Sequence, residues 1–98
     1  SALALVEDAP DQGELAGLRN AAQASPDDMD AQFAFASAAF AGGERASAAG
    51  VLLKIVAAQP EWNEGRAKAR LLQIFEAVGL EDPWVAATRR RLSLILFG

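Results

Sequence analysis

The chain has 98 residues, 52% of them hydrophobic, and a formal net charge of −4 at neutral pH. It contains no cysteine, histidine or tyrosine, which excludes thiolate and imidazole catalysis, disulfides and the usual zinc ligands together. No convincing group of carboxylates and lysines replaces them, so we expect no enzyme activity and no cofactor. The acidic overall charge with scattered arginines also argues against nucleic-acid binding.

Size and composition predict a single all-α domain. Alanine, the best helix former, inflates the hydrophobic content and favours closely packed helices over a bulky core. No apolar run approaches the roughly 20 residues of a membrane-spanning helix, and the first residues lack the basic start of a signal peptide. We therefore expect a soluble domain without membrane contact.

Charge is distributed unevenly along the chain. Residues 1–44 carry eight acidic residues and one arginine, whereas residues 45–98 carry eight basic and five acidic residues. This asymmetry would steer a charged partner, or would simply reflect the solvated surface of a helical protein.

Residues 1–10 have the character of a linker, and the chain starts at Ser1 without a methionine. We expect them to connect to an upstream domain that is absent from this sequence, and residues 11–98 to form a helical domain. Leu15 and Leu18 recur at helical spacing in the first predicted helix, from about residue 11 to residue 24.

The sequence Ser25-Pro26-Asp27-Asp28 predicts the start of a second helix at about residue 27. Ser25 would cap the free amides, Pro26 would occupy the first helical position, and Asp28 would complete a capping box. Asp27, Asp28 and Asp30 suit the positive end of the helix dipole. Binding of a divalent cation is the alternative, but nothing nearby supplies a full oxygen shell.

The spacing of two prolines indicates a repeat. Pro26 and Pro60 are 34 residues apart, and between them lie two predicted helices, 27–41 and 44–58, joined at a Gly-Gly pair. Two helices in 34 residues is the pattern of a tetratricopeptide repeat. The sequence thus predicts an all-α, right-handed tetratricopeptide-like solenoid of about five helices, the alternative being a generic helical bundle.

Positions within the repeat agree with this alignment in part. Ala48 and Leu52 occupy the small and large positions of the second helix, and the pair Phe35-Ala36 occupies those of the first. The small residues Ala36 and Ala48 would let the two helix backbones approach closely. The usual tryptophan and tyrosine positions are filled by other residues, Gln32 and Ala39.

The faces of these two helices separate a core from a candidate groove. The inward face of helix 27–41 comprises Met29, Phe33, Ala36 and Phe40. Phe35 lies about 100° away from Ala36, so we predict that it contacts a different neighbour or lines the concave groove. Helix 44–58 is expected to bury Ala48, Leu52, Ile55 and Val56. Its Gly50 would allow a close helix crossing.

The fourth predicted helix, about residues 61–78, has an apolar arc and a polar stripe. The arc comprises Leu71, Leu72, Ile74, Phe75 and Val78, and the stripe comprises Arg66, Arg70 and Gln73. The stripe would line the concave side of the second repeat and contact acidic groups of a partner. A simple solvated face is the alternative.

Asp82 and Pro83 predict the start of a last helix, which runs to about residue 97. An inward stripe is expected to pack on the preceding helix and comprises Val85, Leu92 and Leu96. Leu94 and Phe97 point elsewhere, beside a basic run that includes Arg90, and we predict an exposed docking face there. Extra burial on a neighbouring helix and fraying of the helix end are the alternatives.

The C-terminal part of the chain resembles a known family. The segment from Trp62 to Gly79, then Asp82-Pro83, the run Arg89-Arg90-Arg91-Leu92-Ser93 and finally Leu96-Phe97 are similar to the end of the bacterial thioredoxin-fused tetratricopeptide co-chaperones, the YbbN-type proteins or chaperedoxins. The similarity begins at about residue 12 and is most specific in the last 37 residues.

This resemblance implies a function. In that family, a thioredoxin-like domain precedes a helical domain, and the whole protein holds unfolded clients and passes them to the chaperonin and Hsp70 in the cytoplasm. The resemblance implies that this chain is the non-catalytic helical half, and that the last helix, from Pro83 to Gly98, contacts chaperonin. The candidate partner-binding residues are Phe35, Arg66, Arg70, Gln73, Arg90, Leu94 and Phe97.

A structural helical adaptor is the main alternative. Such a module would form a homodimer or brace a neighbouring domain, and it would use the same apolar last helix in a self-complementary contact.

Overall fold

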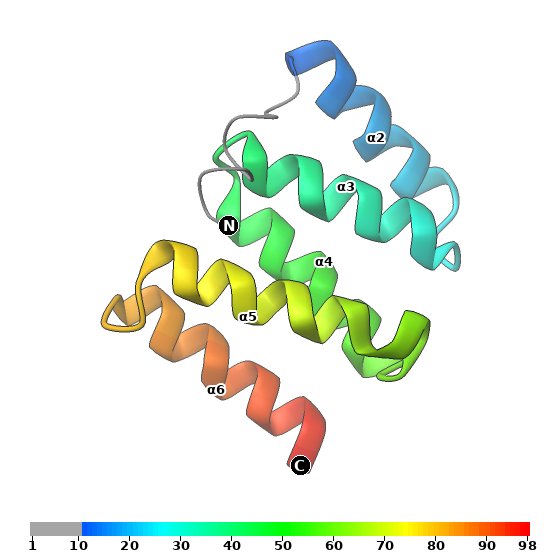
Figure 1. The fold of residues 1–98 in the computed structure, drawn as a ribbon. Coiled ribbons are helices and arrows are strands. Elements are labelled where there is room, and N and C mark those ends of the chain that lie inside the picture. The colour runs from blue at the N-terminus through cyan, green and yellow to red at the C-terminus, as the bar shows by residue number, and fades with distance from the viewer. Residues whose placement is uncertain (1–10) are drawn as a thin grey trace.

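The computed structural model describes residues 11–98, and in this range it is entirely helical with no strand. Five α-helices, α2 (Gln12–Ala24), α3 (Met29–Ala41), α4 (Arg45–Ala58), α5 (Arg66–Val78) and α6 (Pro83–Phe97), are joined by short turns and one 3₁₀-helix, η1 (Trp62–Gly65). Successive helices run antiparallel and stack along one direction (Figure 1). The predicted all-α solenoid of five helices is confirmed. The predicted linker, residues 1–10, lies outside the described residues.

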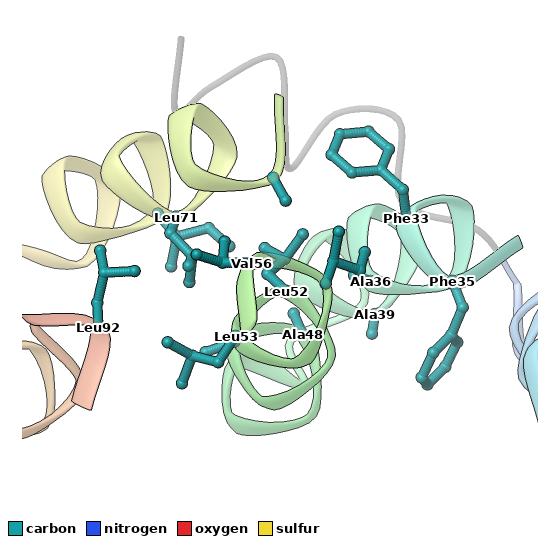
Figure 2. Packing of buried hydrophobic residues seen from close by; sticks show 14 of the residues in the cluster. Phe33, Phe35, Ala36, Ala39, Ala48, Leu52, Leu53, Val56, Leu71 and Leu92 are labelled. Atoms are coloured by element: carbon teal, nitrogen blue, oxygen red, sulfur yellow. The ribbon is translucent and has the colours of Figure 1, made fainter. Parts of the chain in front are cut away.

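The core is centred on α4, which packs against α3, α5 and α6. Ala36 and Ala48 are completely buried where α3 meets α4, so the backbones of these two helices approach closely, as predicted (Figure 2). The largest completely enclosed side chains are Phe75, Leu52, Ile55, Leu71, Ile74, Val56 and Val85. Enclosing each aliphatic side chain of this kind contributes about 1.5–3 kcal/mol, which makes the α4 interfaces the main source of stability.

Gly50 does not mark the close crossing that its position suggested. A Cβ atom added at Gly50 would meet no atom within 4 Å. The prediction is wrong because the neighbouring alanines, Ala48 and Ala49, make the close approach, and both are buried. Gly50 lies on a half-buried part of α4 with open space beside it.

The turn between α2 and α3 uses residues that were expected to start the helix. The Asp28 amide donates to the Ser25 carbonyl at 3.0 Å, with Pro26 at the second position of the turn, where its fixed φ fits well. Asp28 caps α3 by accepting a hydrogen bond from the Ala31 amide at 3.1 Å. Ser25 instead ends α2, so the predicted Ser25 cap is wrong. Residues 25–28 form the proline turn, so α3 can begin only after it, and Asp28 becomes the N-cap.

The start of α5 also differs from the prediction. This helix begins at Arg66 and not at residue 61, because Asn63, Glu64 and Gly65 adopt left-handed backbone conformations, with φ of 48°, 60° and 79°. Consecutive left-handed residues cannot continue a right-handed helix, and glycine adopts this conformation at the lowest cost. The interruption holds Trp62 half-buried beside α3.

Helix α6 starts as predicted but packs differently. The Asp82 side chain accepts a hydrogen bond from the Trp84 amide at 2.8 Å, with Pro83 in the first turn. In the inward stripe, Val85 and Leu92 are buried and Leu96 is half-buried. The closest neighbour of α6 is α4, however, and not α5.

Two contacts of Arg45 join the start of α6 to α4. The Arg45 guanidinium of α4 lies 3.7 Å from the Asp82 carboxylate and 4.8 Å from the centre of the Trp84 ring. These contacts join the first turn of α6 to the start of α4. A cleft of about 720 Å³ lies between the first half of α5 and the end of α6, where Leu72 and Leu96 line it.

Candidate protein-interaction surfaces

The side chains of Phe33 and Phe35 point in opposite directions from α3, so only one of them can contact the arginine stripe (Figure 2). Phe35 is 6% exposed, and the Arg19 guanidinium of α2 lies 5.3 Å from the centre of its ring. Phe33 instead faces α5, where Arg66 and Arg70 lie against it. Of the two alternatives predicted for Phe35, the structure shows contact with a different neighbour and not a place in a groove with these two arginines, because Phe35 points to the α2 side of α3.

Residues from α3, η1 and α5 meet in a single aromatic–arginine cluster, which we define as Phe33, Trp62, Arg66 and Arg70. The Phe33 and Trp62 ring centres are 5.4 Å apart and the rings are tilted by 45°. The guanidinium carbons of Arg66 and Arg70 lie 4.9 and 5.4 Å from the centre of the Phe33 ring. These distances are typical of cation–π contact. The cluster thus presents two cations on an aromatic base.

The other arginines that contact rings are neutralised by acids. Arg19, beside Phe35, forms an ion pair with Glu44 at 2.6 Å. Arg45, beside Trp84, lies 3.7 Å from Asp82. Within residues 11–98, by contrast, no carboxylate lies within ion-pairing distance of Arg66 or Arg70. The described residues therefore leave the positive charge of the aromatic–arginine cluster uncompensated.

The surroundings of Arg70 make this charge unfavourable in the protein alone. Partial burial lowers the pKa of Arg70 below its ordinary value, and the neighbouring charge of Arg66 lowers it further. The lowered pKa means that the charged form of Arg70 is less well stabilised here than in water. A negatively charged group at the cluster would offset both effects. Gln73 is exposed about one turn beyond Arg70 and is not part of the cluster.

Exposed apolar side chains gather on α5, on α6 and in the turn between them. The large hydrophobic residues that are well exposed within the described chain all belong to the last hairpin, and they are Leu72, Leu80, Leu94, Ile95 and Phe97. Leu94 is 61% exposed and Phe97 is 83% exposed. The structure therefore confirms that these two side chains are not used by the core. We call Leu94, Ile95 and Phe97 the terminal apolar surface.

A basic residue accompanies this surface. Arg90 is exposed, and it lies four residues before Leu94 and seven before Phe97, a spacing that places all three on one side of α6. An apolar strip with a cation at its edge suits contact with another protein, because the apolar atoms supply affinity and the charge supplies orientation.

Sequence reasoning missed half of the aromatic–arginine cluster. Arg66 and Arg70 were identified from their spacing, but Phe33 was assigned to the core and Trp62 to a continuous helix. Phe33 is indeed 8% exposed, so its role as a base for cations depends on which helix it meets. The only available signal was the Asn-Glu-Gly segment after Trp62, where the glycine suggests a break in the helix.

Metal binding and membrane crossing find no support in the part of the chain that the structure describes. No group of three or more acidic side chains there is arranged to hold a metal ion, and Asp28 is engaged as a helix cap. No helix among these residues is long and apolar enough to cross a membrane.

Stacked antiparallel helix hairpins with a central helix touching three neighbours define a helical repeat protein. A family model described as tetratricopeptide repeat matches residues 8–97. The chain therefore belongs to the tetratricopeptide repeat family, whose members generally act as non-catalytic protein–protein interaction modules. No curated protein and no solved structure matches the chain.

Proposed function

We propose that this chain is the protein-binding half of a thioredoxin-like co-chaperone of the chaperedoxin type, which holds unfolded clients and docks on chaperonin or Hsp70. One observation carries the proposal: the large apolar side chains that the described residues leave exposed are all on the last hairpin. Membership of the tetratricopeptide repeat family supports a role in protein binding. The resemblance of residues 62–98 to the end of chaperedoxins supports the choice of partner.

The terminal apolar surface would make the specific contact with the chaperone. Burying a fully exposed leucine or phenylalanine side chain contributes about 1.5–3 kcal/mol, and Leu94 and Phe97 are largely exposed in the free chain. Arg90 at the edge of the surface would raise the association rate with an acidic partner.

Clients would be held by weaker contacts elsewhere. The aromatic–arginine cluster and the cleft lined by Leu72 and Leu96 offer apolar area together with cations, which suits transient binding to exposed segments of unfolded proteins. In this proposal residues 1–10 link the helical domain to an upstream thioredoxin-like domain, and the protein works in the cytoplasm.

The test substitutes both exposed residues, Leu94→Asp and Phe97→Asp, and measures capture of purified bacterial chaperonin by the immobilised chain. Two charges on this surface would have to be desolvated on docking, so we expect capture to fall by at least about tenfold. Ala16→Asp with Ala46→Asp is the matched control, because both alanines are exposed and lie outside the last hairpin. Unchanged capture by the Leu94/Phe97 variant would reject the docking assignment.

The same surface also favours a second candidate function, a structural adaptor that dimerises through α6. Sedimentation of the chain over a hundredfold dilution separates the two. A tight dimer that becomes monomeric in the Leu94→Asp, Phe97→Asp variant would favour the adaptor. A monomer that suppresses client aggregation would favour the co-chaperone.

A further inference from the structure

We propose that the aromatic–arginine cluster of Phe33, Trp62, Arg66 and Arg70 binds the acidic side chains of an extended segment of a partner protein. The inference rests on the proposed function, since it presumes that the chain binds other proteins. It adds the chemistry of the bound segment and assigns it to a site distinct from the terminal apolar surface.

Charge compensation differs among the arginines that contact aromatic rings. Three aromatic rings in the described chain carry arginines, namely Phe35, Trp84 and Phe33. The arginine on Phe35 and the arginine on Trp84 each have an acid partner from the chain itself. Phe33 carries two arginines, and residues 11–98 supply no acid to either of them. A carboxylate from outside these residues would complete the same arrangement.

The two arginines of the cluster share one aromatic ring. Both guanidinium groups contact the Phe33 ring, and like charges on side chains four residues apart in a helix repel. The lowered pKa of Arg70 reflects its partial burial first and the charge of Arg66 second. A bound carboxylate would form charge-assisted hydrogen bonds with the arginines and relieve their repulsion, so ligand binding gains from both effects.

The spacing of the two arginines matches that of acidic side chains on an extended peptide. Arg66 and Arg70 are one helical turn apart, which places their Cβ atoms about 5–6 Å from each other. Side chains at alternate positions of an extended peptide point to the same side and are about 6.6–6.8 Å apart. Two acids separated by one residue therefore match the two arginines, whereas adjacent acids in an extended peptide point to opposite sides.

The fluorescence of Trp62, which is part of the cluster, can be used to measure peptide binding. The chain has two tryptophans, so the Trp84→Phe background leaves Trp62 as the only one while keeping an aromatic ring beside Arg45. The probe is a synthetic peptide, acetylated and amidated at its ends, with Glu-Ala-Glu at its centre and alanines on either side. A Gln-Ala-Gln peptide is the matched uncharged probe. A third peptide has Gln-Ala-Gln and a free terminal carboxylate.

We expect the Glu-Ala-Glu peptide to change the Trp62 fluorescence saturably, and to bind at least about tenfold more tightly than either glutamine peptide. Arg66→Gln and Arg70→Gln should each weaken its binding by about fivefold or more. Arg45→Gln is the matched control and should leave binding unchanged, because Arg45 contacts a different ring and is already paired with Asp82. Circular dichroism checks that each variant keeps its helix content.

Several results would overturn the inference. Equal binding of the Glu-Ala-Glu peptide by the parent and the Arg66→Gln and Arg70→Gln variants would show that the cluster is not the site. Equal binding of the peptide with a free terminal carboxylate would show that the site reads chain ends and not acidic side chains. Absence of peptide binding by a chain that still captures chaperonin would reject this inference alone. Failure of the parent chain to capture chaperonin would instead reject the proposed function.

Discussion

The arginines of this chain differ in what surrounds their charge. Arg19 and Arg45 each lie between an aromatic ring and an acid, so their charges are neutralised within the protein. Arg66 and Arg70 share one ring without an acid from the described residues. At the residue scale, the feature that points to a partner is therefore a pair of arginines that share an aromatic ring and have no acid from the described residues, and not the number of basic residues.

Helix capping gives a prediction at the same scale. Replacing Asp28 with alanine removes the acceptor for the Ala31 amide and should lower the free energy of unfolding by about 1 kcal/mol. Urea denaturation measures this loss. Ser25→Ala is the matched control, and it should leave the free energy of unfolding nearly unchanged, since the turn uses the backbone carbonyl of Ser25. A larger effect at Ser25 than at Asp28 would contradict this assignment of the cap.

The capping residues also show how far the sequence could lead. Serine and aspartate are both good caps, so the sequence around Pro26 permits two helix starts. The choice depends on whether the proline opens a turn or a helix, and the path of α2 decides this. At Asp82 and Pro83 only one start was available, and there the prediction is confirmed.

At the scale of elements, α4 organises the fold, because it is the helix that contacts three others. Its burial was predictable from the spacing of Ala48, Leu52, Ile55 and Val56, all of which are enclosed. The packing partner of α6 was not predictable, because periodicity tells which face of a helix is buried and not which helix covers it. The same limit explains why Leu72, a member of the predicted apolar arc, is 46% exposed.

Gly50 supplies a prediction for the α4 element. Glycine in the interior of a helix costs about 0.5–1 kcal/mol relative to alanine, and a Cβ atom at Gly50 would meet nothing within 4 Å. Gly50→Ala should therefore stabilise the fold and raise its melting temperature by roughly 2–8 °C, as measured by circular dichroism.

The matched control for Gly50 is Gly79, whose φ is 120°. Residues other than glycine rarely adopt this backbone conformation, so Gly79→Ala should lower the melting temperature. A decrease for Gly50→Ala would mean that α4 has less space beside Gly50 than the structure shows.

At the scale of the whole molecule, charge and apolar exposure are both polarised along the stack. The acidic first half forms α2 and α3, while the basic second half contains the aromatic–arginine cluster and the exposed apolar side chains of the last hairpin. Leu94 and Phe97 could be identified from the sequence because the inward stripe of α6 already accounted for its core contacts. The cluster required Phe33 of α3 to meet the arginines of α5, and a linear pattern does not contain this meeting.

Amide hydrogen exchange with and without saturating purified bacterial chaperonin tests the central claim most directly, because it shows where on the intact chain the partner binds. The account predicts slower exchange in α6, residues 83–97, and unchanged exchange in α2, residues 12–24. Protection confined to α2, or no protection anywhere in the chain, would contradict the claim that the last hairpin is the docking surface.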